Sequence, residues 1–295
     1  MASVSPTDEF RALVARPPEG IPLDVGCLLI AAHAHPAAEA PGVVPAGLAA
    51  LDAIAQRCPG PDLDDVRGHL FGTLGFAGNR RRYDDPRNSF LDVVLQRRLG
   101  IPITLAVVVI EVGRRVGLSL AGVGMPGHFL VAAGEDRYLD AFDGGRVLDG
   151  QGCRERFVEL AGPGAPWSPE LLERSDPRVV LARVLANLRQ LFAQSQDLRG
   201  LDWVLELRLG IPGVPAAERA DRASVLSALG RYDEAARELE RLAETEEAGS
   251  DGLAGEGVGA RLAAGAQGRP SDGHAEGEAA AGLRARAAQL RARLN

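Results

Sequence analysis

Apolar residues recur every three or four positions through most of the first 75 residues, a spacing that is typical of α-helices. The stretch from 22 to 36 is apolar on nearly every side, so the helix expected there should be buried. Further helices are expected over residues 8–17, 45–58 and 63–74. The beginning of the chain is therefore predicted to be mainly helical.

Two more helices are expected next, separated by a short break. Asn88 or Ser89 can cap the first of them, and Gly100 is expected to end it. Pro102 suits the first turn of the following helix, which should run over residues 103–116. Because the faces of this second helix are mostly apolar, we expect it to lie in the core.

The apolar pattern then changes to one that is typical of β-strands. Residues 120–133 and 136–149 are expected to form strands joined by a turn at residues 134–136. Helices followed by strands indicate an α+β domain, in which the central helix packs on a small antiparallel sheet. A segment rich in proline and glycine at 162–169 is expected to end this domain.

Helical patterns return in the rest of the chain. The first domain, with its N-terminal helices, is expected to cover residues 1–162, and an all-α tail is expected over 170–246. Residues 247–278 are rich in Gly, Ala, Ser and charges without apolar periodicity, so we expect disorder there. A final basic helix is expected over 279–295.

The composition narrows the classes of partner. The net charge is −7 and the pI is about 5.4, whereas binding to nucleic acid needs concentrated Lys and Arg. The longest apolar run, residues 103–110, is too short to span a bilayer, and the N-terminus lacks a signal-peptide pattern. We expect a soluble cytoplasmic protein without a nucleic-acid or membrane partner, whose oligomeric state the sequence does not define.

The cysteines do not indicate a disulfide framework or a metal centre. Cys27, Cys58 and Cys153 are odd in number, widely spaced and without a CxxC pair. A reducing compartment suits this usage. Neither a metal nor another cofactor is expected.

The order of elements around the central helix is that of a thiol enzyme. In papain- and transglutaminase-like folds a cysteine begins the buried helix, and a histidine from a neighbouring strand takes its proton. A carboxylate on the next strand orients that histidine. Here His128 and Asp140 lie 12 residues apart on adjacent expected strands, a spacing that a hairpin can bring into contact.

The motifs around these residues resemble a known bacterial family. "DPRNSFL", "GIPITL" and "PGHFLV" all occur between Phe71 and Leu148. This stretch is similar to the transglutaminase-like domain of the bacterial SirB-type family, in which tetratricopeptide-type helices follow the domain. The resemblance implies a papain-like α+β domain, and it implies that His128 and Asp140 occupy two positions of a catalytic triad.

The nucleophile position departs from the superfamily's motif, which reads Gly-x-Cys-x-x-x-Ala. Residues 100–106 match this frame, with Pro102 in the place of the cysteine, and proline has no nucleophilic atom. Ala141 also replaces the proline of the family's usual Asp-Pro-Phe. Thr104 lies two places into the helix, where a hydroxyl more often bonds a backbone carbonyl.

Two functions therefore remain open. One is a non-catalytic transglutaminase-like scaffold that binds a protein or peptide. The other is a hydrolase or acyltransferase that uses His128 and Asp140 with a water or an unrecognised nucleophile. The pair can also be purely structural, and the native cysteines can be plain core residues. The sequence does not decide whether the protein is an enzyme.

The polar loop before the central helices also allows two interpretations. As a binding rim, it would aim Asn79, Tyr83, Arg87 and Asn88 into a cleft. As an internally bonded loop, it would use Asp85 and Asn88 to satisfy its own backbone amides.

One segment of the tail fits a tetratricopeptide hairpin. Ala223 and Ala235 are small where two helices must approach closely, Gly230 can turn the chain, and Tyr232 can pack at the corner. The sequence therefore predicts a short helical repeat after the first domain.

Overall fold

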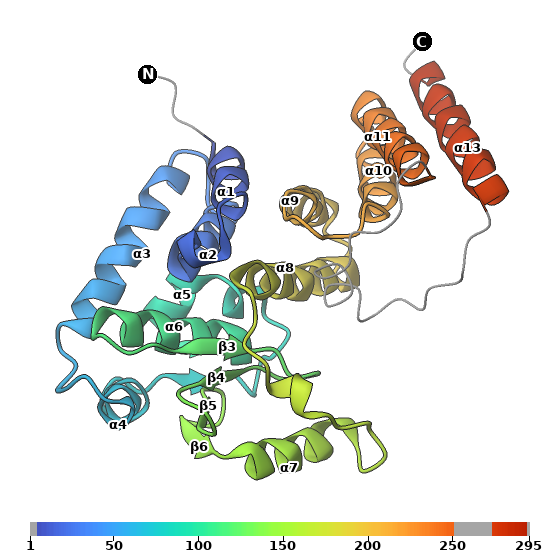
Figure 1. The fold of residues 1–295 in the computed structure, drawn as a ribbon. Helices are drawn as coiled ribbons and strands as arrows, with labels where there is room; N and C mark the ends of the chain where they lie inside the picture. Colours follow the sequence, from blue (N-terminus) through green and yellow to red (C-terminus); the bar gives the residue numbers. More distant parts are fainter. Residues whose placement is uncertain (1–4, 251–272, 294–295) are drawn as a thin grey trace. The chain divides into compact units, whose positions relative to one another are not determined.

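The computed structural model describes residues 5–250 and 273–293 (Figure 1). Its contacts divide the chain into two compact units, Met1–Asn187 and Leu188–Asn295. Among the described residues, no helix combines the length and the apolar character needed to cross a membrane.

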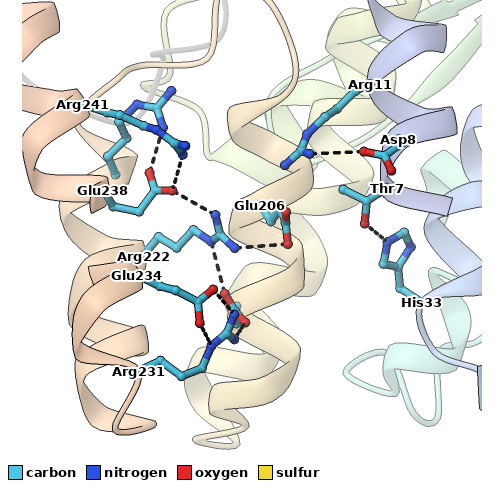
Figure 2. A network of polar contacts seen from close by, with 12 residues as sticks. Thr7, Asp8, Arg11, His33, Glu206, Arg222, Arg231, Glu234, Glu238 and Arg241 are labelled. Atoms are coloured by element: carbon cyan, nitrogen blue, oxygen red, sulfur yellow. Dashed lines mark hydrogen bonds and ion pairs between the residues drawn. The ribbon is translucent and has the colours of Figure 1, made fainter. Parts of the chain in front are cut away.

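Four helices begin the first unit, as the apolar spacing predicts. They are α1 (Pro6–Val14), α2 (Leu23–Ala32), α3 (Ala40–Ala55) and α4 (Leu63–Arg67), and the last continues as a π-helical turn, Gly68–Thr73. Nearly all of α2 is buried, which confirms the expectation for that helix. α3 begins earlier than expected because Pro45, which reads as a helix start, lies inside it. Thr7 of α1 lies 3.0 Å from the ring of His33 at the end of α2 (Figure 2).

The predicted caps around the next helix, α5 (Leu91–Arg97), are wrong. Its N-cap is Phe90, which makes no side-chain cap, so neither Asn88 nor Ser89 has that role. Asn88 is instead the last residue of a short 3₁₀ turn, Pro86–Asn88, whose N-cap is Asp85. At the other end Arg98 adopts the left-handed conformation, with φ 58°, that we expected of Gly100.

Gly100 has a different use. It lies in β2 (Leu99–Gly100), which pairs in parallel with β1 (Ala77–Gly78). A Cβ at Gly100 would lie 2.8 Å from Oγ1 of Thr104 and 3.1 Å from Cγ of Leu105. Glycine therefore allows this strand to pass close to the start of the central helix.

The central helix, α6 (Pro102–Arg115), begins with Pro102 in its first turn, and residues 102–113 are all buried. The apolar pattern does not predict the charges at its far end. Glu111 is buried beside Asp24 of α2, and Arg115 donates to both carboxylates, at 3.1 Å and 2.8 Å. Burial, followed by the charge of Asp24, raises the pKa of Glu111.

The sheet is an antiparallel meander of four short strands, β3 (Ala121–Val123), β4 (Leu130–Ala132), β5 (Tyr138–Asp140) and β6 (Arg146–Leu148). Two longer strands were expected. Each is interrupted by glycines with positive φ, Gly127 in the first and Gly144 and Gly145 in the second. α6 packs against β3 and β4 (Figure 1), so the expected α+β arrangement of helix on sheet is present.

The chain after the sheet stays with the first unit. α7 (Gly150–Ala161) is capped by Asp149. Beyond it Trp167 and Leu172 pack on the sheet's core cluster, and the backbone N–H of Ser175 donates to the carbonyl of Gly122 at 2.8 Å. The boundary between the units therefore lies inside α8 (Pro177–Gln194) rather than at residues 162–169.

The second unit is entirely helical among its described residues. Its helices after α8 are α9 (Leu198–Leu209), α10 (Glu218–Ala228), α11 (Tyr232–Ser250) and α13 (Gly273–Ala292). Ala223 and Ala235 lie in the core between α10 and α11, and Gly230 turns the chain with φ 77°. Ala287 and Leu290 of α13 join the same core.

The disorder expected over 247–278 concerns mostly residues 251–272, which lie outside the described residues. The two ends of that segment are helical, because α11 continues to Ser250 and α13 begins at Gly273.

Buried ion pairs link the helices of the second unit. Arg222 of α10 contacts Asp202 at 3.1 Å. It also contacts Glu206 at 3.1 Å and Glu238 at 3.0 Å (Figure 2). The Arg222 side chain is only 10% exposed, so these carboxylates balance a charge that is largely removed from water.

Candidate functional site

His128 and Asp140 meet where two strands of the sheet approach each other. Asp140 is the last residue of β5, and His128 lies two residues before β4. The register pairs Val131 with Leu139, so its extension places Leu130 opposite Asp140 and His128 diagonally across from it. Nε2 of His128 lies 2.8 Å from Oδ2 of Asp140, so the contact predicted from their spacing is present.

Asp140 is buried, at 1% exposure, and has several donors. Its Oδ1 accepts the backbone N–H groups of Phe142 at 3.0 Å and Asp143 at 3.1 Å, and Arg156 lies 3.4 Å from Oδ2. Burial alone would raise the pKa of Asp140. The hydrogen bond from His128 and the positive charge of a protonated His128 ring act against burial, as do the backbone N–H of Asp143 and the charge of Arg156, and the net effect is a lowered pKa of Asp140. The carboxylate is therefore ionised at neutral pH and can only accept.

The ionised carboxylate determines the tautomer of His128. Nε2 must carry the proton that it donates to Asp140, which leaves Nδ1 as the acceptor in a neutral ring. Among the described residues, no other group hydrogen-bonds to this ring. The side chain of His128 is 3% exposed, and the ring of Phe142 packs edge-on against it with centroids 6.4 Å apart.

Arg183 of α8, which the sequence does not indicate as a site residue, also positions His128. Its Nη2 donates to the backbone carbonyls of His128 at 3.0 Å and Met125 at 3.1 Å, and its guanidinium lies over the ring of Phe129. Burial lowers the pKa of Arg183. No sequence signal connected this arginine with the site, because it lies 55 residues beyond His128 in an expected amphipathic helix.

The start of α6 contains no free nucleophile. Pro102 is buried and has no reactive atom. The hydroxyl of Thr104 donates to the carbonyl of Asn88 at 2.7 Å and accepts the backbone N–H of Ile101 at 3.2 Å. Thr104 therefore holds the helix start against the preceding loop, in line with the backbone role favoured from the sequence.

The native thiols are poorly suited to replace the missing cysteine. Cys27 and Cys153 are fully buried, and Cys58 donates to the carbonyl of Gly60 at 3.3 Å. Burial is the main cause that raises the pKa of all three thiols, to about 12 for Cys153. Since the thiolate is the reactive form, none of them is activated.

The loop before α5 is bonded internally. Nδ2 of Asn79 donates to Oδ1 of Asn88 at 2.9 Å, and Nδ2 of Asn88 donates to the carbonyls of Arg82 at 2.7 Å and Tyr83 at 3.1 Å. Both asparagines are buried, so they organise the loop and do not form an open rim. Arg87 forms an ion pair with Asp85 at 2.9 Å.

The outer face of this loop is mainly basic and aromatic, with one exposed aspartate, Asp84. An open depression is lined by residues 80–87, where Arg81, Arg82 and Tyr83 are exposed. Tyr83 packs edge-on against Phe142, with centroids 5.8 Å apart, and Arg80 lies over the Phe142 ring at 5.0 Å. Phe142 thus connects the exposed loop with the buried ring of His128.

Within the described ranges, no group of three or more His, Cys, Asp or Glu side chains could hold a metal ion. The site's polar groups are instead bonded to one another, as the pair His128–Asp140 shows.

Comparison with known proteins shows what the chain is similar to. Residues 46–186 match the model of the transglutaminase-like superfamily. A UPF0162 protein of Xylella fastidiosa strain Temecula1 is 41% identical over 186 residues, which are 60% of this chain and 65% of that protein. A UPF0162 protein of Pseudomonas aeruginosa is 35% identical over 158 residues, or 50% of this chain and 57% of that protein.

A more distant similarity links the chain with eukaryotic proteins. The mouse F-box only protein 21 is 35% identical over 140 residues, which are 44% of this chain and 21% of that protein. No solved structure matches the chain. The matches cover 65% or less of the length of each of these relatives. Residues 46–186, which include Pro102, His128 and Asp140, are thus similar to the transglutaminase-like superfamily, and the chain is similar to the bacterial UPF0162 proteins.

Proposed function

We propose that the first unit is a transglutaminase-like domain that has lost its nucleophile and acts as a scaffold for an acidic peptide segment of a partner protein. The second unit would follow it as tetratricopeptide-type helices, as the SirB-type resemblance implies. Pro102 at the start of α6 and the raised pKa of the native thiols support the non-catalytic part of this proposal.

The observation that carries the proposal is the surroundings of His128. An acyl-transfer enzyme needs a thiol or hydroxyl within hydrogen-bond reach of this base. Among the described residues, the ring's one hydrogen bond is to Asp140, and Phe142 packs against it. The pair His128–Asp140 therefore acts as a structural support for the turn after β5, which contains Phe142.

Charge and exposure favour an acidic ligand. The whole chain is acidic, yet four arginines gather on the loop at residues 80–87. Arg80 and Arg87 pair with Asp143 and Asp85, whereas Arg81 and Arg82 make no ion pair with any described residue. Two unpaired guanidiniums beside the exposed ring of Tyr83 can bind carboxylates and pack on a peptide.

The test is the binding of a fluorescein-labelled octaglutamate peptide, measured by anisotropy. The double variant Arg81→Glu/Arg82→Glu is expected to weaken binding at least about tenfold, and added salt should weaken wild-type binding. The matched control is Arg154→Glu/Arg199→Glu, which makes the same charge change at two other exposed arginines. An equal loss of peptide affinity in both double variants would show that the effect depends only on the net charge of the protein, and it would reject the loop as the binding site.

A hydrolase remains the alternative, and one observation favours it. With Nε2 bonded to Asp140, Nδ1 of a neutral His128 ring would be the unprotonated nitrogen that a general base requires. Hydrolysis of p-nitrophenyl acetate that is lost in His128→Gln, while the variant remains folded, would support this alternative. Activity no greater than the uncatalysed rate in the wild-type protein would reject it for this ester.

A further inference from the structure

A cavity of about 310 Å³ lies between the segment that contains α3 and helix α5, and it shares no residue with the His128–Asp140 site. One side is formed by the residues before and along α3, and the other by α5. Its lining includes His35, Glu39, Val43, Ala46, Asp92 and Leu95.

The carboxylate of Asp92, at the edge of this cavity, has a hydrogen-bond partner at only one of its two oxygens. Oδ2 of Asp92 lies 2.6 Å from Nε2 of His35, whereas Oδ1 is buried and has no donor among the described residues. The Asp92 side chain is 9% exposed. Because a buried carboxylate oxygen without a donor is costly, a donor brought by a ligand would stabilise it.

The charges around the cavity favour a cation. Glu39 adds a second carboxylate, 3.9 Å from Nδ1 of His35. No arginine lines the cavity, and the sequence contains no lysine. A ligand in the cavity would therefore meet two carboxylates, of Glu39 and Asp92, and the imidazole of His35.

Apart from Gln96, the remaining lining is apolar or glycine. Val43, Ala46 and Leu95 form this part of the wall. A Cβ built on Gly42 would meet nothing within 4 Å, so the space beside that turn of α3 is open. The volume is near the lower end of the range for small-molecule sites, about 300–1,000 Å³.

We infer that this cavity binds a small free primary amine, whose ammonium donates to Asp92 and whose aliphatic body lies along Val43, Ala46 and Leu95. The ammonium offers a charge-assisted hydrogen bond to the Asp92 carboxylate, whose Oδ1 has no donor among the described residues, and the apolar body displaces water from the small side chains. A second copy of this chain cannot bring the same group as a lysine side chain, because the sequence has none. The site is independent of the proposed peptide surface.

The experiment titrates the ¹⁵N-labelled full chain with n-butylamine and follows amide shifts by NMR. Saturable shifts are expected for residues of both α3 and α5, and n-butanol and butanoate should not produce them at the same concentrations. Asp92→Asn is expected to weaken the affinity for n-butylamine at least about tenfold, because it removes a charge-assisted hydrogen bond. Ala46→Leu should weaken it similarly by occupying the cavity.

Glu135→Gln is the matched control, since it removes one negative charge from an exposed turn and should leave the affinity unchanged. The Ala46→Leu arm keeps the test decisive if Asp92→Asn does not fold. Equal affinity for n-butanol would overturn the inference of a cation site, and so would unchanged n-butylamine affinity in folded Asp92→Asn. The absence of saturable shifts with n-butylamine would overturn the site itself. Binding of Nα-acetyl-lysine methylamide tenfold tighter than n-butylamine would assign the cavity to a partner's lysine instead of a free amine.

Discussion

Nε2 of His128 lies 2.8 Å from Oδ2 of Asp140, and this contact joins the residue that ends β5 to the segment that leads into β4. Oδ1 of the same carboxylate accepts the N–H groups of Phe142 and Asp143, which begin the turn after β5. The buried Asp140 carboxylate thus holds both the His128 ring and the turn after β5 in place. These contacts stabilise the fold independently of any catalytic role.

Replacement of Asp140 should therefore destabilise the fold. Asp140→Ala leaves His128 and two backbone N–H groups without their acceptor, so we expect a loss of about 3 kcal/mol in the free energy of unfolding. The measurement is urea unfolding followed by circular dichroism. Asp143→Ala is the control, because Asp143 is 36% exposed and its pair with Arg80 should contribute at most about 1 kcal/mol. Similar losses in the two variants would show that Asp140 has no special structural role.

The same carboxylate predicts a pH dependence. The pKa of Asp140 is lowered in the folded protein, whereas an unfolded aspartate titrates near about 3.9. Its contribution to stability is therefore fully present above about pH 3.9, and it is lost as the pH falls through the lower folded value. Below about pH 4, the free energy of unfolding of the wild-type protein should fall more steeply than that of Asp140→Asn. Glu135→Gln should retain the wild-type slope, and an equal slope in Asp140→Asn would contradict this account.

Elements with a strong local pattern could be predicted from the sequence. The apolar faces of α2 and α6 indicate burial directly, and the spacing of His128 and Asp140 predicts their contact. The helix ends were less predictable. Arg98 takes the left-handed position that favours glycine, because Gly100 is needed where β2 passes Thr104. The apolar pattern does not show such close approaches between a backbone and neighbouring side chains.

The contacts made over long sequence separations were not predictable either. Arg183 reaches the carbonyl of His128 from α8, and Asp92 meets His35 across 57 residues. Each of these residues reads locally as a polar position on a helix or loop. Their partners follow from tertiary packing, which a single sequence does not specify.

Thr104 should be important for stability, in keeping with its contacts at the start of α6. Thr104→Val keeps the shape of the side chain but leaves the carbonyl of Asn88 and the N–H of Ile101 without their bonds. We expect the free energy of unfolding to fall by about 2 kcal/mol. Thr245→Val, which removes an exposed hydroxyl bonded to a helix carbonyl, is the matched control and should change it by less than about 0.5 kcal/mol. A nucleophilic role would be indicated if Thr104→Val abolished esterase activity without loss of stability.

The second unit should depend on Arg222. Arg222→Met leaves Asp202, Glu206 and Glu238 without a shared cation in a partly buried position, so we expect a loss of about 3 kcal/mol. Arg237→Met is the control, because Arg237 is 54% exposed and pairs within its own helix with Asp233. Urea unfolding of the full chain measures both. A loss of less than about 1 kcal/mol in Arg222→Met would mean that the buried charges do not stabilise this helical unit.

The assignment of Pro102 to the nucleophile position can be tested by restoring a thiol there. Pro102→Cys would place sulfur at the first turn of α6, a buried position where the helix N-terminus stabilises a thiolate and counteracts the effect of burial. The native cysteines provide a low background, because burial raises their pKa values. We expect Pro102→Cys to react with iodoacetamide at pH 7 at least about tenfold faster than any native cysteine, as measured by mass spectrometry of the alkylated peptides.

Two further variants separate activation from mere exposure. Ser119→Cys introduces an ordinary thiol at an exposed position and should react more slowly than Pro102→Cys. If His128 activates the new thiol, then His128→Gln in the Pro102→Cys background should slow its alkylation, because glutamine cannot take the proton. Suppose that folded Pro102→Cys reacts no faster than Cys58. The match of residues 100–106 with a nucleophile motif would then be wrong. His128 and Asp140 would be a structural pair, and Pro102 would not occupy the position of a lost nucleophile.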